Sequence, residues 1–356
     1  MKQMTRRGWA IGLAMLTAWG LSGCGGGNDP VPPKASISKV YVMGDSLADV
    51  GTFSGLKFTI MDTVNPVNSE VWPQLIANQF GLDGSAQCNF YSIASGVSTN
   101  SSCTNYAIGG ARIVNKSTDT LPTLGTQLAT RGVAAYAAGD LLLVDGGGND
   151  AADLIAASAD PGSFQTILLQ LLSPGDLSTL MTADSTGNAA AVAYMQALAD
   201  TLYNAIQTQA LDKGASRVGV LNIPDVTITP RFQSIQGTPY QTAFRAWISA
   251  FNNRLQTRAG SDRRVAIVDF YADFQDEIAH PASYSLSNVV DQACTVDNGI
   301  PFNYFPCTAA GLDTMAGKTP GWWQSYAFSD GFHPTPYGHR LLAASVSRAL
   351  ARAGWL

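Results

Sequence analysis

The stretch Lys39-Val40-Tyr41-Val42-Met43-Gly44-Asp45-Ser46 decides the fold class. Its first five residues form a short apolar run that stops at a glycine, which is typical of a buried parallel strand followed by a turn. A second such run, Leu141–Val144, ends in three consecutive glycines. Segments with helical spacing of apolar residues lie between runs of this kind. The pattern therefore predicts an α/β fold in which helices cover both faces of a parallel sheet.

The rest of the chain continues this alternation to its end. The predicted strands are 39–43, 140–145, 217–223 and 264–270, and the predicted helices are 72–80, 127–138, 189–211, 240–257 and 337–351. No internal repeat is visible, so we expect one domain over residues 39–356. Two stretches, 156–187 and 271–329, exceed ordinary loop length, and long insertions in such folds often form the walls or lids of a site.

The N-terminal segment predicts export. A basic start is followed by residues 9–21, an uncharged core that is too short to cross a bilayer as a helix but suits a signal peptide. Leu21-Ser22-Gly23-Cys24 then resembles the bacterial lipobox, in which the cysteine is acylated. We expect a lipoprotein signal peptide over 1–23, lipid on Cys24 and a flexible tether over 24–38. An ordinary signal peptide is the alternative.

The four cysteines that remain besides Cys24 fall into two local pairs. Because export favours disulfides, we expect Cys88–Cys103 and Cys294–Cys307, although four cysteines permit three pairings. A zinc site is not expected, since the chain has no Cys-x-x-Cys and only 3 histidines. The formal net charge of −5, without a basic cluster in the body of the chain, argues against nucleic acid as a partner.

Polar residues follow the two glycine-ended strands. In open parallel sheets, ligands bind beyond the carboxyl ends of the strands, which is where Ser46 and Asn149 are expected. A serine at a strand-to-helix turn projects its hydroxyl into the crevice, and the amides of the turn can bind an oxyanion. The Asn149 amide and a backbone amide of the Gly109-Gly110 pair are further candidate donors.

Asp330-Gly331-Phe332-His333 stands near the C-terminus. A neutral serine hydroxyl is a poor nucleophile and needs a base, and histidine is the usual one near neutral pH. An aspartate three residues earlier can accept a hydrogen bond from the imidazole and fix its tautomer. Ser46, His333 and Asp330 are therefore the candidate catalytic residues. Asp45, Asp49 and Asp150 are interpreted as structural, and His339 as a packing or surface residue of the last helix. Asp145 could mimic a triad acid but lies on the wrong block, and His280 lies in a long loop with no visible partner.

These blocks, in this order, resemble the GDSL or SGNH hydrolase family. The resemblance implies that Ser46 is the nucleophile, that His333 is the base and then the acid, and that Asp330 orients His333. It also implies an oxyanion hole made of the Ser46 amide, the Gly110 amide and the Asn149 side chain, with Gly109 as the rival of Gly110. No metal or organic cofactor is implied. The implied fold is a three-layer α/β/α sandwich with about five parallel strands in flavodoxin-like order.

The form of the motifs looks most like a branch of secreted bacterial esterases that includes lipolytic autotransporter passengers. The chain ends at Leu356, so we expect no membrane barrel, and lipid on Cys24 would hold the protein to a membrane in its place. Gly25 after Cys24 is compatible with the outer membrane, on its periplasmic or its surface side, and release as a secreted protein stays open. The implied partners are small-molecule or lipid esters.

The substrate stays open among short-chain acyl esters, lysophospholipids and choline esters. A deacetylase of a surface glycan is the alternative enzyme, and a non-catalytic binding module on the same fold is an alternative of another class. The intact set of Ser46, Asn149, Asp330 and His333 speaks against that module. The aromatic cluster before Asp330 has two interpretations: a core that anchors the loop, or the wall of an acyl, alcohol or cationic head-group pocket. Its members are Trp322, Trp323, Tyr326 and Phe328.

Overall fold

The chain is described here by a computed structural model, which covers residues 36–84, 86–93, 96–294 and 307–356. The expected signal peptide, the lipidation site at Cys24 and all but the last three residues of the expected tether lie outside the described residues. The described residues, from Ser36 onward, belong to one compact unit.

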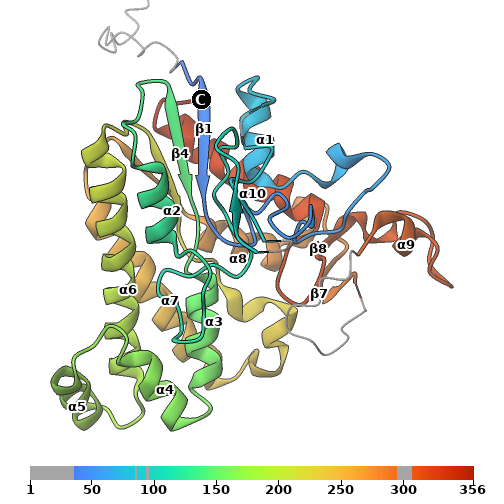
Figure 1. Cartoon of the computed structure of the whole chain (residues 1–356). Coiled ribbons are helices and arrows are strands. Elements are labelled where there is room, and N and C mark those ends of the chain that lie inside the picture. The colour runs from blue at the N-terminus through green and yellow to red at the C-terminus, as the bar shows by residue number, and fades with distance from the viewer. Residues whose placement is uncertain (1–35, 85, 94–95, 295–306) are drawn as a thin grey trace, which may run out of the picture. The chain divides into compact units, whose positions relative to one another are not determined.

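The central sheet has four parallel strands in the order β1-β4-β5-β6 (Figure 1). They are β1 (Lys39–Met43), β4 (Asp140–Val144), β5 (Val218–Leu221) and β6 (Val265–Val268). Every residue of β4 and β5 is buried. Continuous apolar runs of this kind form strands that are covered on both faces, and all four predicted strands are confirmed to within a few residues.

A fifth segment extends the sheet beyond β1. The Val42 amide donates to the Thr104 carbonyl (3.1 Å), and the Tyr106 amide donates to the Val42 carbonyl (2.8 Å). Only one parallel bridge, between Val42 and Asn105, accompanies these bonds, so residues 104–108 follow β1 without forming a regular strand. The central sheet therefore has four regular strands where about five were expected, and with residues 104–108 beside β1 the order of the segments is flavodoxin-like.

Alternate side chains of the strands enter two separate apolar cores. Leu142 and Val144 pack into the core beneath helices α2 (Leu124–Arg131), α6 (Asn188–Gln209) and α7 (Pro239–Ala259). Leu141 and Leu143 point the other way, into the core beneath the second helical layer. That layer consists of α1 (Trp72–Gln79), α8 (Phe270–Ala279) and α10 (Pro336–Arg352). Figure 1 shows α2 and α6 on one side of β1 and β4, and α10 on the other, which completes the three layers.

The two long stretches contain more structure than the sequence suggested. Residues 156–187 hold the end of α3 (Gly148–Ala157) and two helices, α4 (Pro161–Leu168) and α5 (Pro174–Ala183). Asp160 and Ser173 cap the last two helices through their side chains. Each is followed by a proline at the first helical position. A capping residue followed by proline is a helix start signal that is visible in the sequence, and it was missed because the stretch was judged by its length.

The stretch 271–329 contains short elements around α8. They are the parallel pair β7 (Asn288–Gln292) and β8 (Tyr326–Phe328), the helix α9 (Ala309–Asp313) and a 3-10 turn over Trp322–Ser325. The other small sheet pairs β2 (Tyr91–Ser92) with β3 (Ser98–Thr99), antiparallel to each other. None of these elements joins the central sheet, so they serve as loops that surround its carboxyl edge.

Both expected disulfides are confirmed. Cys88 is bonded to Cys103 and Cys294 to Cys307, with Cα–Cα distances of 5.3 and 6.0 Å. The first pair closes the loop that leads into residues 104–108. No helix in the described part of the chain combines the length and the apolar composition that crossing a bilayer requires. No group of three or more metal-ligating side chains is present among the described residues.

Candidate active site

Ser46 lies in the turn that follows β1. The Gln127 side chain from α2 clamps this turn, because it accepts a hydrogen bond from the Gly44 amide (2.8 Å) and donates one to the Gly44 carbonyl (3.0 Å). A side chain at position 44 would collide with Asp145, which explains the glycine before the Asp45-Ser46 pair. The clamp holds Ser46 in a fixed place at the carboxyl edge of the sheet, where only 4% of its surface is exposed.

His333 and Asp330 reach Ser46 from the other end of the chain. His333 Nε2 lies 2.8 Å from Ser46 Oγ, and His333 Nδ1 lies 2.8 Å from Asp330 Oδ2. The Asp330 carboxylate also accepts the backbone amides of Phe332 (2.8 Å) and His333 (2.7 Å), which closes the turn between them. The three predicted residues therefore form one chain of hydrogen bonds, in which a proton can pass from the serine to the imidazole.

The turn that carries His333 is fixed between β8 and α10. The Ser329 amide and hydroxyl both donate to the His333 carbonyl (2.8 and 3.0 Å). Two residues after His333, the Thr335 side chain caps α10 by accepting the Gly338 amide. The imidazole is 7% exposed, and the Asp330 side chain is 35% exposed. The histidine is thus shielded from water, while its carboxylate partner keeps some contact with solvent.

The charge state of Asp330 suits a partner of His333. Its partial burial alone would raise its pKa, but the nearby His333 charge and the hydrogen bonds from the imidazole and from two backbone amides outweigh that effect. The pKa of Asp330 is consequently lowered from its usual value. The carboxylate stays ionised at neutral pH and can stabilise an imidazolium on His333.

Asn149 occupies the first turn of α3, next to the end of β4. Gly147, with φ of 93°, caps this helix in a backbone conformation that favours glycine. The Asn149 amide nitrogen donates to the Ala111 carbonyl (3.0 Å) and lies 3.3 Å from Asp45 Oδ2. These contacts hold the side-chain amide beside the Asp45-Ser46 turn, where an oxyanion can replace the longer contact to Asp45 as the partner of one N–H group.

The structure distinguishes Gly109 from Gly110 as the candidate backbone donor to the oxyanion besides the Ser46 amide. The Gly109 amide already donates to Asp49 Oδ2 at 2.7 Å. Within the described residues, neither the Gly110 amide nor the Ser46 amide has a hydrogen-bond partner. Gly110 also has φ of 81°, a conformation that glycine adopts without strain. Gly110 and Ser46 therefore remain the candidate backbone donors, and Gly109 does not.

A family model described as GDSL-like Lipase/Acylhydrolase matches residues 40–346, which include all of the residues placed above. The chain belongs to the GDSL-like lipase/acylhydrolase family. A protein of Pseudomonas putida, described as an uncharacterized protein in the trpE-trpG intergenic region, is 27% identical over 317 residues. That alignment covers 86% of this chain and 47% of the relative, so the chain spans about half the length of the curated relative that it matches.

Solved structures give a weaker likeness to this GDSL-family chain. An extracellular lipase from Streptomyces rimosus is 17% identical, with a TM-score of 0.40, and covers 88% of this chain and 100% of its own. The lipase Lip_vut3 from a goat rumen metagenome is 15% identical, with a TM-score of 0.41, and the match covers 88% of this chain and 97% of the lipase. Because both scores are below 0.5, the family assignment rests on the family model alone.

The sequence did not reveal how the Gly110 loop of this GDSL-family fold is attached to the Asn149 helix. Asp150 accepts the backbone amides of Ile113 and Val114, both at 3.0 Å. Arg112 donates to the Gly110 carbonyl (2.8 Å) and to Asp153 of the same helix (2.6 Å). These hydrogen bonds tie the Gly110 loop to the first two turns of α3 and so hold the two candidate oxyanion donors at a fixed distance from each other.

Two buried carboxyl groups, Asp45 and Asp145, lie directly under the Ser46 turn. The Asp45 amide donates to Asp145 Oδ1 (3.0 Å), and Asp45 Oδ1 accepts the Leu47 amide (3.0 Å). Burial raises the pKa of both groups, and the neighbouring Asp45 raises that of Asp145 further. The sequence showed Asp145 only as a residue on the wrong block for a triad, and its place beneath the turn depends on the pairing of β1 with β4.

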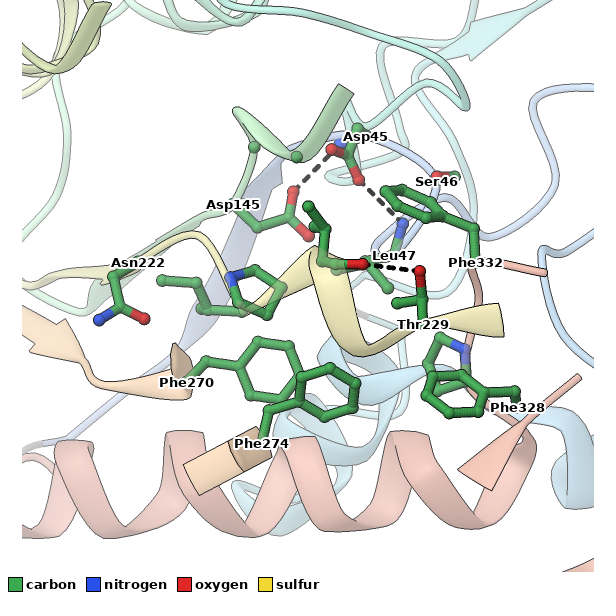
Figure 2. A pocket seen from close by; sticks show the side chains of 16 residues that line it. Asp45, Ser46, Leu47, Asp145, Asn222, Thr229, Phe270, Phe274, Phe328 and Phe332 are labelled. Carbon is green, nitrogen blue, oxygen red and sulfur yellow. Dashed lines mark hydrogen bonds between the residues drawn. The ribbon is translucent and has the colours of Figure 1, made fainter. Parts of the chain in front are cut away.

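A pocket opens beside Ser46 (Figure 2). Its empty volume is about 650 Å³, including the open mouth, and its walls are mainly apolar. Four phenylalanines from three parts of the chain contribute to it: Phe270, Phe274, Phe328 and Phe332. Of these, only Phe328 belongs to the aromatic cluster noted in the sequence. Phe270 and Phe274 both lie on α8, whereas the sequence predicted residue 270 as the end of a strand and residue 274 as part of the long stretch 271–329.

The rest of the aromatic cluster anchors its own loop. Trp322 donates to the Leu312 carbonyl (3.1 Å), and Trp323 donates to the Asp313 carboxylate (2.8 Å), so both indoles are tied to α9. Together with Tyr326 they belong to a small core around Ile60 and Leu312. The anchoring interpretation therefore holds for these three residues, and the pocket-wall interpretation holds for Phe328.

Three remaining polar residues lie apart from the Ser46–His333–Asp330 chain in structural roles. Asp49 accepts the Gly51 and Thr52 amides as well as that of Gly109. His339 is fully buried within α10, and burial lowers its pKa to about 3. His280, for which the sequence showed no partner, is paired at the surface with Asp276 one helical turn away (2.8 Å).

Proposed function

We propose that the protein is a carboxylic ester hydrolase that works through an acyl-serine intermediate on Ser46. The observation that carries this proposal is the continuous chain from Asp330 through His333 to Ser46, with 2.8 Å at each link. Membership of a lipase/acylhydrolase family supports the same class of reaction. The proposal assigns the nucleophile to Ser46, the base to His333 and the orienting carboxylate to Asp330.

The first half of the reaction forms the acyl-enzyme. His333 Nε2 removes the proton from Ser46 Oγ as the oxygen attacks the ester carbonyl carbon. The carbonyl oxygen becomes an oxyanion and accepts hydrogen bonds from the Ser46 and Gly110 amides and from the Asn149 side chain. The carbon–alcohol oxygen bond then breaks, and His333 gives its proton to the departing alkoxide. In the second half, His333 removes a proton from a water molecule, whose oxygen attacks the acyl carbon. The bond to Ser46 Oγ then breaks, His333 returns the proton to Ser46 Oγ, and the acid is released.

The experiment that tests the proposal compares two serine variants on a panel of p-nitrophenyl esters. Ser46→Ala should keep the thermal transition of the wild type and lose ester hydrolysis down to the background rate. Ser92→Ala, at an exposed position of β2, is the matched control and should hydrolyse at the wild-type rate. Turnover by a folded Ser46→Ala protein near the wild-type rate would refute the assignment.

We also propose that the mature protein is exported and lipidated at Cys24. Two disulfides favour an oxidising compartment, and the basic start, the uncharged core and the lipobox-like residues precede the fold. Mass spectrometry of the membrane fraction of a producing bacterium tests this. A diacylglyceryl-modified N-terminus at Cys24 is expected, and a mature N-terminus at another residue would overturn the proposal.

A further inference from the structure

We propose that Phe58 is a positioning residue of the reaction, because its ring sets the gap between His333 and the Gly109-Gly110 loop. This inference rests on the proposed esterase function and adds a residue to it. Phe58 lies in the segment between β1 and α1, outside the sequence blocks that identified the other site residues. Three observations support the proposal: the ring touches both parts of the site, the space at its tip is full, and its segment is anchored to the turn of His333.

The ring of Phe58 lies against the imidazole of His333. The two ring centroids are 5.2 Å apart and the planes meet at 47°, which is within the range of aromatic contact. Phe332 touches the same imidazole edge-on at 5.7 Å and also lines the pocket beside Ser46 (Figure 2). The imidazole is therefore in contact with one ring from its own turn and with one from a distant part of the chain. Because Phe58 is only 2% exposed, its ring also keeps water from that side of the imidazole.

The tip of the same ring lies on the backbone of Gly109. A Cβ atom at position 109 would stand 1.9 Å from Cζ of Phe58 and 2.3 Å from its Cε2. Two carbon atoms in contact are about 3.5–4.0 Å apart, so the ring tip occupies the place where a side chain would begin. Gly109 is not among the glycines with positive φ, and the ring is therefore the reason why this position has no side chain.

The backbone of Gly109 fixes the place of the candidate oxyanion donor that follows it. The Ile108 amide donates to the Gly44 carbonyl (3.1 Å), and the Gly109 amide donates to Asp49 Oδ2 (2.7 Å). These bonds hold the loop against the turn of the nucleophile on one side, while the Phe58 ring bounds it on the other. Because Gly110 is joined directly to Gly109, a shift of Gly109 would move the Gly110 amide relative to the base.

The segment that carries Phe58 is anchored on both sides of the ring. After it, the Thr59 hydroxyl donates to the Pro334 carbonyl (3.0 Å), which bonds the segment to the turn of the catalytic histidine. Before it, the Lys57 ammonium group donates to the Gln74 side chain of α1 (2.9 Å). The ring cannot swing away from the site without breaking these contacts, so its position is fixed before a substrate binds.

The reaction needs the base and the oxyanion donors at set distances from Ser46 Oγ. Packed protein interiors have low compressibility, so a ring between His333 and Gly109 keeps the two apart by its own width. Without the ring tip, the imidazole or the loop can shift, and a displacement of about 1 Å can lower a rate about 10²-fold. The lining of the described pocket beside Ser46 does not include Phe58. Its loss should therefore change kcat much more than KM.

Steady-state kinetics of Phe58→Leu with p-nitrophenyl butyrate tests the proposal. Leucine keeps a buried apolar side chain but lacks the ring tip. We expect kcat to fall by about 10- to 100-fold and KM to change by less than about threefold. Phe164→Leu shortens another buried ring, which stacks on Trp247 away from the site, and it should keep the wild-type kcat. Rates are divided by the amount of protein that a fluorophosphonate labels at completion, so that unfolded molecules do not count.

A second pair of variants tests the contact between the ring and the loop. Gly109→Ala alone should lower kcat, because the new methyl group and the ring tip of Phe58 cannot occupy the same space. In the double variant Gly109→Ala, Phe58→Leu the methyl group takes the space that the ring tip has left. The double variant should therefore have a kcat at least about fivefold above that of Gly109→Ala. Independent damage at two sites would instead add up and lower kcat further.

Failure of this inference can be told apart from failure of the proposed function. If the wild type hydrolyses no ester, the esterase proposal fails and this one fails with it. Three results with an active wild type would overturn the role of Phe58 alone. They are a wild-type kcat in Phe58→Leu, a loss in Phe58→Leu that lies in KM, and a double variant that is no more active than Gly109→Ala.

Discussion

His333 Nε2 lies 2.8 Å from Ser46 Oγ, although 287 positions separate the two residues in the sequence. The contact exists because Ser46 follows strand β1 of the central sheet while His333 precedes α10, and α10 packs on the same sheet. Both residues are held by their own turns, through Gln127 at one end and Ser329 at the other. A pair fixed in this way can act without a large rearrangement when substrate binds.

Replacement of His333 by alanine should lower kcat for ester hydrolysis by about 10⁴-fold or more, with a smaller change in KM, because the serine loses its base. Steady-state kinetics on a p-nitrophenyl ester measures this. His280→Ala is the matched control, since the His280 side chain is exposed and pairs with Asp276 on the surface. A His333→Ala protein that keeps a tenth of the wild-type kcat would contradict the proposed role.

Asn149→Ala should lower kcat by roughly 10²–10³-fold, the usual effect of removing one oxyanion donor. KM should change less, because the oxyanion exists only in the transition state. Asn253→Ala, at an exposed position of α7, serves as the control. If Asn149→Ala raised KM and left kcat intact, Asn149 would be a ground-state contact and not an oxyanion donor.

Asp150 should give the protein a pH-dependent stability. Burial raises its pKa to about 7, whereas an aspartate in an unfolded chain titrates at about 4. Between these values the folded protein retains a proton that the unfolded chain has lost. The stabilisation is complete below about pH 4 and is lost as the pH rises to about 7, by up to ~1.4 kcal/mol per pH unit.

Urea unfolding of the wild type and of Asp150→Asn at several pH values measures this effect. The neutral asparagine cannot titrate, so the free energy of unfolding of the wild type should fall relative to the variant as the pH rises from about 4 to about 7. Curves that stay parallel over this window would show that Asp150 is ionised in the folded protein throughout.

The Cys88–Cys103 disulfide should stabilise the loop that leads into residues 104–108. Closing a loop of 15 residues reduces the entropy of the unfolded chain, and the Cys88→Ser, Cys103→Ser double variant should lose about 3 kcal/mol of unfolding free energy. Denaturant unfolding of the exported protein checks this. An unchanged midpoint would mean that the backbone bonds to Val42 hold the segment without the disulfide.

The sequence was sufficient to predict the strands of the central sheet and the positions of Ser46 and Asn149 at the ends of two of them. Buried parallel strands have a distinct apolar pattern, so β1 and β4 were recognisable from their own residues. Ser46 and Asn149 could then be assigned to the carboxyl edge of the sheet, because each comes shortly after such a strand. The two disulfides followed from local spacing, since a short closed loop limits the possible partners.

The contacts between distant segments could not be predicted in this way. The pairing of Asp145 with Asp45 depends on the register of β1 against β4, and the aromatic pocket depends on how α8 packs beside β8. The choice between Gly109 and Gly110 required the position of the Asp49 carboxylate. None of these relationships has a signature in residue spacing, because each arises from tertiary packing.

The formation of an acyl-serine at Ser46 is tested most directly by intact-mass analysis after exposure to a fluorophosphonate, a reagent that phosphonylates activated serines. The wild type should gain one adduct, which peptide mapping places on Ser46, and the rate of labelling should fall sharply in His333→Ala. The folded Ser46→Ala protein should gain none. An adduct on another residue, or equal labelling of Ser46→Ala, would contradict the account.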